Sequence, residues 1–206
     1  LAHNNSVIMA IAPDRKNSTH FQKTLAFNDF YLAGGRNNRP LGNVQMRGKI
    51  LPGMLKRKPN HLLRARADYW AERSVDFWLM SEDLPDPDNR IHVDSSDRLH
   101  LIWQPNNVAP HLELVRRTQD ILRQAGFPIL FTERRGVETI SHQCGTLRFG
   151  TDPARAVLDP YCRSFDLPNL YVVDTSFYPS SAAVNPALTL AAQALRVASH
   201  LKEKWL

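Results

Sequence analysis

The amino-acid sequence predicts a mixed α+β or α/β fold, in which an antiparallel sheet with covering helices is followed by a C-terminal strand and helix. Three observations support this class. Residues 74–80 alternate as a β-strand does, residues 110–125 have the spacing of an amphipathic helix, and residues 186–204 form the strongest helical stretch, rich in Ala and Leu. With 206 residues, 43% of them hydrophobic, the chain can bury one substantial core or two modest ones.

The first forty residues carry weaker signals. Residues 1–20 show no clear period, and their clusters of Asn, Pro-Asp and Ser-Thr predict a loop. Residues 21–32 are rich in aromatic side chains and are a candidate strand. Residues 34–42 predict a long turn, because Gly and Asn tolerate positive φ and Pro interrupts regular pairing.

The middle of the chain predicts an antiparallel meander. After the strand at residues 74–80, residues 90–93 and 99–103 alternate on either side of an Asp-Ser-Ser-Asp turn, which is typical of a hairpin. Residues 110–125 then have apolar side chains along one helical stripe, and Gly126 ends the helix. We therefore expect a surface helix that covers a sheet.

The last third predicts short strands and one long helix. Residues 128–131 and 136–140 are short strand candidates, and the apolar run at residues 170–173 is typical of a strand buried on both faces. The helix at residues 186–204 begins with a proline, and Asn185 is suited to cap it.

Composition excludes several classes of protein. The longest mainly apolar run, residues 182–194, is interrupted by polar residues and is shorter than the ~20 residues of a membrane span. The two cysteines, Cys144 and Cys162, cannot build a disulfide framework, and no zinc-ligand spacing is present. We expect a soluble protein without a membrane span or a metal site. The sequence does not fix the compartment and slightly favours the cytoplasm.

Much of the net charge of +6 comes from residues 47–66. A nucleic-acid footprint is one interpretation of this basic segment. A solvated basic face is the other, and it is favoured because aromatic residues are not interleaved with the charges. We expect no nucleic-acid partner and keep a basic nucleic-acid-binding module as an alternative.

Two features near the C-terminus could carry chemistry. A helix that opens just after Asn185 leaves the N–H groups of Ala187 and Leu188 pointing out of its first turn, where partial negative charge is favoured. A strand that ends in Asp174 and Thr175 places a carboxylate and a hydroxyl at the edge where α/β sheets bind ligands. Taken alone, each feature more often has a structural role.

His142 is the candidate base, although a lone histidine is more often packed or solvated than catalytic. In an extended segment His142 and Cys144 share a face, so a Cys/His hydrolase is a further alternative. This alternative is less favoured because no neighbouring acid orients the histidine. Cys144 is then a small packed residue.

The segment Gly136–Leu201 resembles the C-terminal signature of the glucose/methanol/choline (GMC) flavin oxidoreductases. The matching motifs are His142-x-x-Gly145-Thr146, Arg148-x-Gly150-x-Asp152-Pro153, Val157-Leu158-Asp159, Asn169-Leu170-Tyr171-Val172-Val173-Asp174-x-Ser176, Pro179 and Asn185-Pro186-x-Leu188-Thr189. Upstream, Asn28–Tyr31, Gly42–Gln45 and Glu82–Pro85 look like looser parts of the same family's substrate domain.

The resemblance implies oxidation of the CH–OH group of an alcohol or sugar-like substrate, with FAD as cofactor and hydride passing to flavin N5. His142 falls on the position of the general base, and Asn185 on the partner that hydrogen-bonds the substrate oxygen. This pairing is chemically sensible, because an imidazole with a pKa of ~6.5 accepts a proton at neutral pH. The amide does not compete for that proton.

The resemblance also implies which residues contact the cofactor. Asp174 and Thr175 match positions near the pyrophosphate and ribityl chain of FAD. Pro186 and Ala187 match the helix start that lies against the isoalloxazine ring, in agreement with the argument from helix ends.

One part of the family pattern is missing: no Gly-x-Gly-x-x-Gly fingerprint occurs in the sequence. We therefore expect the chain to be the C-terminal part of a longer enzyme. Residues 1–131 would bind the substrate, and residues 132–206 would complete a Rossmann-like FAD-binding domain together with the N-terminal part. Alone, the chain should bind FAD poorly and be inactive.

Overall fold

The computed structural model describes residues 1–18, 23–140 and 142–205. The fold is mixed α/β and contains an antiparallel sheet, as the sequence predicts. Two compact units make up the chain, and each is assembled from separate segments. The sheet unit comprises residues 5–81 and 108–138, and the C-terminal unit comprises residues 1–4, 82–107 and 139–206.

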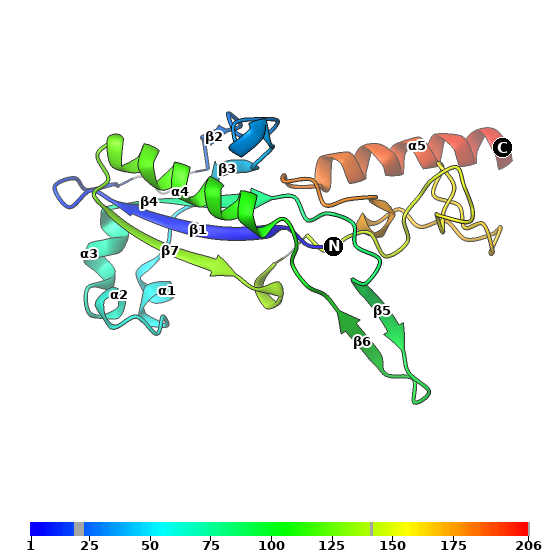
Figure 1. Ribbon diagram of the computed structural model, residues 1–206, viewed down its shortest axis with the longest axis horizontal. Coiled ribbons are helices and arrows are strands. Elements are labelled where there is room, and N and C mark those ends of the chain that lie inside the picture. The colour runs from blue at the N-terminus through cyan, green and yellow to red at the C-terminus, as the bar shows by residue number, and fades with distance from the viewer. Residues whose placement is uncertain (19–22, 141, 206) are drawn as a thin grey trace. The chain divides into compact units, whose positions relative to one another are not determined.

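The sheet has five strands in the order β2-β3-β4-β1-β7 (Figure 1). The strands are β1 (Asn4–Ile11), β2 (Ala26–Phe27), β3 (Asn43–Met46), β4 (Ser74–Ser81) and β7 (Ile129–Arg135). Antiparallel pairing joins β1 to β7, β2 to β3 and β3 to β4. The predictions of strands at residues 74–80 and 128–131 are confirmed by β4 and β7.

The prediction of a loop over residues 1–20 is wrong, because β1 is a buried strand near the middle of the sheet. Val7, Met9 and Ile11 belong to one apolar cluster, and Ile8 and Ala10 belong to another. Both faces of β1 are therefore covered. A strand buried on both faces has no apolar–polar alternation to reveal it.

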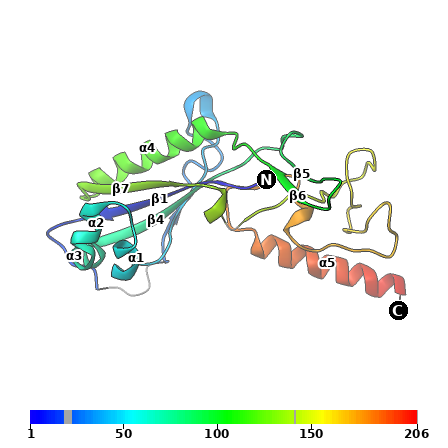
Figure 2. The same cartoon turned by 90° about the horizontal axis from the view of Figure 1, so that it is seen from below.

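Helices cover the two faces of the sheet. Helix α4 (Val108–Gln124) packs on one face, and the short helices α1 (Pro52–Lys56), α2 (His61–Ala65) and α3 (Ala67–Glu72) pack on the other (Figure 2). The expected surface helix over residues 110–125 is thus confirmed. Its buried face includes Leu114, Val115 and Leu122, which follow helical spacing.

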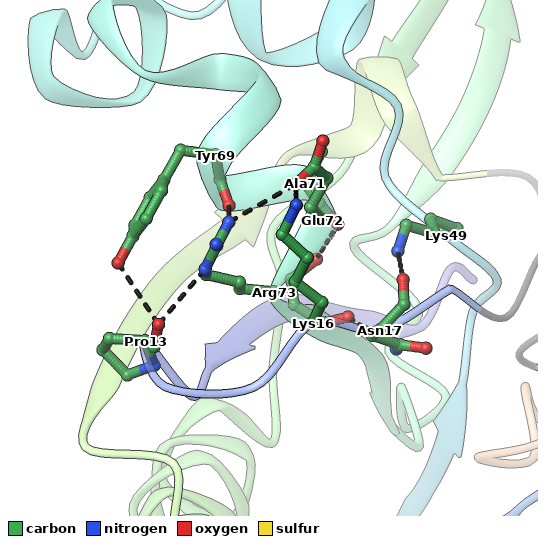
Figure 3. Close-up of polar contacts among 9 residues, drawn as sticks. Pro13, Lys16, Asn17, Lys49, Tyr69, Ala71, Glu72 and Arg73 are labelled. Carbon is green, nitrogen blue, oxygen red and sulfur yellow. Dashed lines mark hydrogen bonds and ion pairs between the residues drawn. The ribbon is translucent and has the colours of Figure 1, made fainter.

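Polar contacts hold the chain after β1 against α3 (Figure 3). The carbonyl oxygen of Pro13 accepts hydrogen bonds from Tyr69 Oη at 3.4 Å and from Arg73 Nε at 3.1 Å. Lys16 and Glu72 form an ion pair at 3.1 Å. These contacts fix the direction in which the chain leaves the sheet.

The turn expected at residues 34–42 contains the short 3-10 helix η1 (Arg36–Asn38). Asn37 and Asn38 both have φ of 57°, which asparagine tolerates better than most residues. The strand expected at residues 21–32 is reduced to β2, and residues 19–22 lie outside the described part of the chain.

Strands β5 (Arg90–Val93) and β6 (Leu99–Ile102) form the predicted hairpin, with His92 opposite His100. The expected meander is wrong, however, because the hairpin is a separate two-stranded sheet. The physical reason is that β4 already has β3 and β1 as its two neighbours.

The rest of the C-terminal unit consists of turns, isolated bridges and the long helix α5 (Ala187–Trp205), which confirms the helix predicted over residues 186–204. The strands predicted at residues 136–140 and 170–173 are wrong. The first segment contains the 3-10 helix η2 (Val137–Thr139), and in the second Tyr171 forms a single bridge with Arg163. A buried strand needs neighbours along its length, and a short apolar run does not supply them.

Candidate active site

Hydrogen bonds and a tight glycine contact fix the chain that directly follows His142. On its C-terminal side, the backbone nitrogen of Cys144 donates to the Leu1 carbonyl oxygen at 3.1 Å, and the Leu1 backbone nitrogen donates to the Cys144 carbonyl oxygen at 3.1 Å. Gly145 has φ of +83°, and a Cβ atom there would lie 2.6 Å from Leu1 Cδ1. Only glycine suits this backbone and this close approach. The half-buried His142 thus lies just before a constrained turn of the backbone.

A second segment, Thr175–Tyr178, runs beside the His142 loop. The Thr175 hydroxyl donates to the Gln143 carbonyl oxygen at 2.8 Å, and the Gly145 backbone nitrogen donates to the Thr175 carbonyl oxygen at 3.3 Å. Further along, the backbone nitrogen of Leu147 donates to the Ser176 carbonyl oxygen at 3.0 Å. Residues about thirty positions apart are therefore joined by a short ladder.

Asp174 shapes the turn at the start of this segment. Its Oδ1 accepts hydrogen bonds from the backbone nitrogen of Ser176 at 2.8 Å and from the Ser176 hydroxyl, and it caps the 3-10 helix η3 (Thr175–Phe177). The residue itself is exposed. One oxygen of the carboxylate is thus used for hydrogen bonds within its own turn.

The same segment holds the start of α5. Tyr178 Oη donates to the Pro186 carbonyl oxygen at 2.8 Å, and the backbone nitrogen of Leu190 donates to the same carbonyl at 3.0 Å. Burial raises the pKa of Tyr178, so its hydroxyl keeps the proton that it donates. Asn185 and Ala187 at this helix start are exposed. His142 and Asn185 are therefore carried by segments that bond to one intervening segment.

Sequence reasoning missed His3, which packs against His142. The two ring centroids are 5.0 Å apart and the ring planes meet at 83°. His3 is only 1% exposed, and among the described residues neither of its ring nitrogens makes a well-formed hydrogen bond. Burial lowers the pKa of His3 to about 4, and the neighbouring His142 adds to this shift. A hydrogen bond with the Ser181 backbone raises the pKa by a smaller amount. The apolar run that follows at residues 7–12 was the available sign of a buried strand.

Asp83 fixes the backbone around His3. Its Oδ2 accepts hydrogen bonds from the backbone nitrogen of Ala2 at 2.9 Å and from Trp103 Nε1 at 3.2 Å. Its own backbone nitrogen donates to Ser181 Oγ at 3.0 Å. Two segments distant in sequence thus bond to one buried carboxylate, and a third bonds to the backbone of the same residue.

The Cys/His alternative finds no support in the surroundings of Cys144. The thiol is buried, and burial raises its pKa to about 11. At neutral pH the thiolate fraction is then on the order of one in ten thousand, while the thiolate is the reactive form. Cys144 is a packed residue in this structure.

The basic segment is partly neutralised within the sheet unit. Lys56 pairs with Asp68 at 3.4 Å, and Lys58 pairs with Glu133. Arg47 lies over the ring of Trp78, with its guanidinium carbon 5.6 Å from the centroid. These contacts give the positive charges structural partners and favour the solvated basic face over a nucleic-acid footprint.

Over residues 1–18, 23–140 and 142–205, no group of three or more His, Cys, Asp and Glu side chains is arranged to hold a metal ion. No helix within the same ranges is long and apolar enough to cross a membrane.

The start of α5 has the chemistry to receive an electron-rich part of a cofactor. The first N–H groups of a helix have no acceptor within it, and the helix dipole adds partial positive charge. Leu188 in this first turn is 83% exposed, so the helix start is open to a ligand. The sequence itself lacks a glycine-rich phosphate-binding loop.

Comparison with known proteins identifies the family. Residues 85–194, about half of the chain, match the family model described as GMC oxidoreductase. The chain belongs to the GMC oxidoreductase family, whose members are generally FAD-dependent flavoproteins, and the match is to the C-terminal domain of that family.

Two relatives and one solved structure illustrate the match. The chain is 36% identical over 132 residues to 6'''-hydroxyparomomycin C oxidase of Streptomyces lividus, covering 58% of this chain and 24% of that protein. It is 32% identical over 184 residues to paromamine 6'-oxidase of Streptomyces fradiae, covering 85% of this chain and 32% of that protein. The crystal structure of pyridoxine 4-oxidase from Mesorbium loti superposes with a TM-score of 0.52 at 20% identity, over 98% of this chain and 44% of that one. The chain thus spans about a quarter to a third of the length of the two oxidases from Streptomyces and less than half of pyridoxine 4-oxidase. The likeness to the solved structure supports the fold.

Proposed function

We propose that this chain is the C-terminal part of an FAD-dependent enzyme that oxidises the CH–OH group of an alcohol or sugar-like substrate. The observation that carries the proposal is the arrangement of two segments. The loop of His142 and the start of α5, which carries Asn185, are both hydrogen-bonded to Thr175–Tyr178. In a GMC oxidoreductase this arrangement would hold the proton acceptor His142 and the amide of Asn185 on segments joined by Thr175–Tyr178.

His142 acts as the general base in this proposal. As the substrate is oxidised, the O–H and C–H bonds break, a C=O bond forms, and the hydroxyl proton passes to a ring nitrogen of His142. A half-buried imidazole on a constrained loop suits this role, because a base must lie within hydrogen-bond reach of the proton that it removes. When bound, FAD supplies the acceptor for the hydride at flavin N5.

Asn185 positions the substrate oxygen. Its side-chain amide can donate a hydrogen bond to that oxygen and does not titrate at neutral pH, so it leaves proton transfer to His142. It lies immediately before Pro186, whose carbonyl oxygen is held by Tyr178 Oη at 2.8 Å. This support limits the freedom of the residue that orients the substrate.

Four residues would contact FAD. Pro186 and Ala187 would lie against the isoalloxazine ring, where the exposed N–H groups of the α5 start favour negative charge. Asp174 and Thr175 would lie along the ribityl chain. A carboxylate repels a pyrophosphate and accepts hydrogen bonds from hydroxyl groups, so the ribityl hydroxyls suit Asp174 better than the phosphates do.

The chain would need a second part of the same enzyme. In this proposal residues 1–131 contribute to substrate binding, and residues 132–206 complete a Rossmann-like FAD-binding domain. The N-terminal part supplies the phosphate-binding loop that this sequence lacks. The 206-residue chain alone would then bind FAD weakly and oxidise nothing.

The test is His142→Ala in the full-length enzyme, beside His61→Ala as a matched control on the exposed start of α2. Anaerobic reduction of the bound flavin is followed with paromamine, glucose and benzyl alcohol as probe substrates. We expect His142→Ala to slow reduction about 100-fold or more, in line with the loss of a general base. Asn185→Ala should slow it less, and His61→Ala should not change it.

Two outcomes would contradict the proposal. Unchanged flavin reduction in His142→Ala would refute the assignment of the base. Failure of every probe alcohol to reduce the wild-type flavin would refute the proposed reaction.

A further inference from the structure

His3 is an unusual residue for a protein core. It is 1% exposed, yet among the described residues neither Nδ1 nor Nε2 makes a well-formed hydrogen bond, and the nearby Ser181 backbone has only a small effect on the ring. Burying a polar group without a good hydrogen bond destabilises the folded state. Packing alone is therefore a poor reason for a histidine at this position, since an apolar ring would fill the same space without that cost.

The backbone on both sides of His3 is fixed. Asp83 Oδ2 accepts from the backbone nitrogen of Ala2 at 2.9 Å, and Asn4 Nδ2 donates to the carbonyl oxygen of Asn106. On the facing segment, Ser181 Oγ accepts from the Asp83 backbone nitrogen at 3.0 Å. The His3 ring therefore projects from a rigid stretch of chain and has little freedom to move.

The ring of His3 meets the ring of His142 at 83°, with 5.0 Å between centroids. Edge-to-face packing of aromatic rings has a defined geometry and is favourable beyond the burial of the two rings. Because His3 is rigid, the contact restricts the rotation of the half-buried His142.

We propose that His3 is a positioning residue, whose rigid buried ring holds the imidazole of His142 in the orientation required to accept the substrate proton. This inference rests on the proposed function, since it gives His142 the role of base. Because His3 is only 1% exposed, it would touch neither substrate nor flavin. It acts through the ring of His142.

Electrostatics agree with this division of roles. Burial and the nearby His142 lower the pKa of His3 to about 4, so His3 is neutral at physiological pH. Two adjacent imidazoles disfavour a charge on each other. A neutral His3 leaves His142 as the ring that takes up the proton. The other titratable groups at this place are Asp83, hydrogen-bonded to Ala2 and Trp103, and Cys144, whose pKa of about 11 keeps it neutral.

The expected size of the effect follows from the demand on orientation. A displacement of about 1 Å in a catalytic group can cost on the order of 100-fold in rate. We expect His3→Ala in the full-length flavoenzyme to slow anaerobic flavin reduction about 10- to 100-fold. His3→Phe keeps a planar ring of similar size and should stay within about 5-fold of wild type.

The pH profile of flavin reduction separates positioning from general loss of structure. Water that fills the space vacated in His3→Ala would solvate the charged imidazolium of His142 and raise its pKa. The apparent pKa of flavin reduction should therefore move upward in His3→Ala. The ring resonances of His142, observed by NMR in enzyme labelled with ¹³C histidine, should report the same upward shift without turnover.

His111→Ala serves as the matched control, because His111 is equally buried and lies in the sheet unit. It should lower stability while leaving the rate and pH profile of the folded, flavin-bound enzyme unchanged. If His3→Ala yields no flavin-bound enzyme, His3→Leu replaces it, since leucine fills space without a planar ring and should give the same kinetic change.

The outcomes are distinct. Positioning by the ring would be overturned if His3→Ala or His3→Leu kept the wild-type rate and pH profile. It would also be overturned if His3→Phe were as impaired as these variants. If His3→Ala reduces flavin at the wild-type rate while His142→Ala is slowed, only this inference is refuted. If His142→Ala reduces flavin at the wild-type rate, the proposed function itself is refuted.

Discussion

The two units each bury a histidine, and the two differ in what their ring nitrogens contact. In the sheet unit, His111 Nε2 lies 2.8 Å from Ser6 Oγ and His111 Nδ1 lies 2.9 Å from Ser81 Oγ. In the C-terminal unit, His3 has no such partner among the described residues. Burial lowers the pKa of each to about 4, aided by Arg134 near His111 and by His142 near His3. Burial and a shifted pKa therefore do not by themselves mark a functional histidine. Our proposal for His3 rests instead on the contact of its ring with His142 and on the absence of a well-formed hydrogen bond to its ring nitrogens among the described residues.

The stability of two alanine variants would test this contrast most strongly. His111→Ala leaves two buried serine hydroxyls without their partner, each costing about 1–3 kcal/mol, and also opens a cavity. His3→Ala opens a cavity of the same kind and removes at most the weak interaction with the Ser181 backbone. We expect His111→Ala to be the more destabilising by about 2 kcal/mol or more, measured from urea denaturation of the full-length enzyme. An equal or larger loss in His3→Ala would remove the distinction.

The pH dependence of stability offers a second test. Burial raises the pKa of Asp76 to about 6, although hydrogen bonds from Ile50 and Ser74 oppose the shift. The folded state then binds the Asp76 proton more tightly than the unfolded state, so this group lowers stability as the pH rises from about 4 to 6. The lowered pKa values of His3 and His111 act in the opposite sense, because their contribution is lost as the pH falls from about 6.5 to 4.

In Asp76→Asn, the pH dependence of stability that comes from His3 and His111 should no longer be offset by Asp76. The amide oxygen can still accept the Ile50 hydrogen bond, which is 2.7 Å long in the wild type. We expect the variant to gain stability more steeply than wild type between pH 4 and 6, by up to about 3 kcal/mol over that range. Denaturation midpoints measured at half-unit pH intervals provide the comparison. Parallel curves for the two proteins would contradict the assigned shift.

Two threonines give the smallest effect. Thr118 in α4 is fully buried, and its hydroxyl has no hydrogen-bond partner among the described residues, whereas the Thr175 hydroxyl donates to the Gln143 carbonyl oxygen at 2.8 Å. Thr175→Val should therefore cost about 1 kcal/mol and slow flavin reduction a few-fold by loosening the His142 loop. Thr118→Val should be neutral or slightly stabilising, since it removes an unsatisfied polar atom.

Thermal denaturation midpoints and anaerobic flavin reduction of both threonine variants supply the readouts. A destabilised Thr118→Val beside an unaffected Thr175→Val would reverse the expected order. It would also show that the hydrogen bond between the two segments contributes little to the site.

The sequence itself determined the elements whose pattern is local. Strand β4, helix α4 and helix α5 follow from periodicity and from turn and cap residues over one short window each. The hairpin of β5 and β6 follows in the same way. The family followed from ordered motifs around His142 and Asn185, and the match over residues 85–194 confirms it.

Tertiary structure alone decided the rest. Strand β1 is buried on both faces and so carries no alternation, and the run at residues 170–173 has the composition of a strand without neighbours to pair along it. Above all, His3 and His142 are 139 positions apart, and the two backbone hydrogen bonds between Leu1 and Cys144 join the segments that carry them. Local sequence encodes which backbone shape is favoured. Which side chains meet is set by the whole set of long-range bonds.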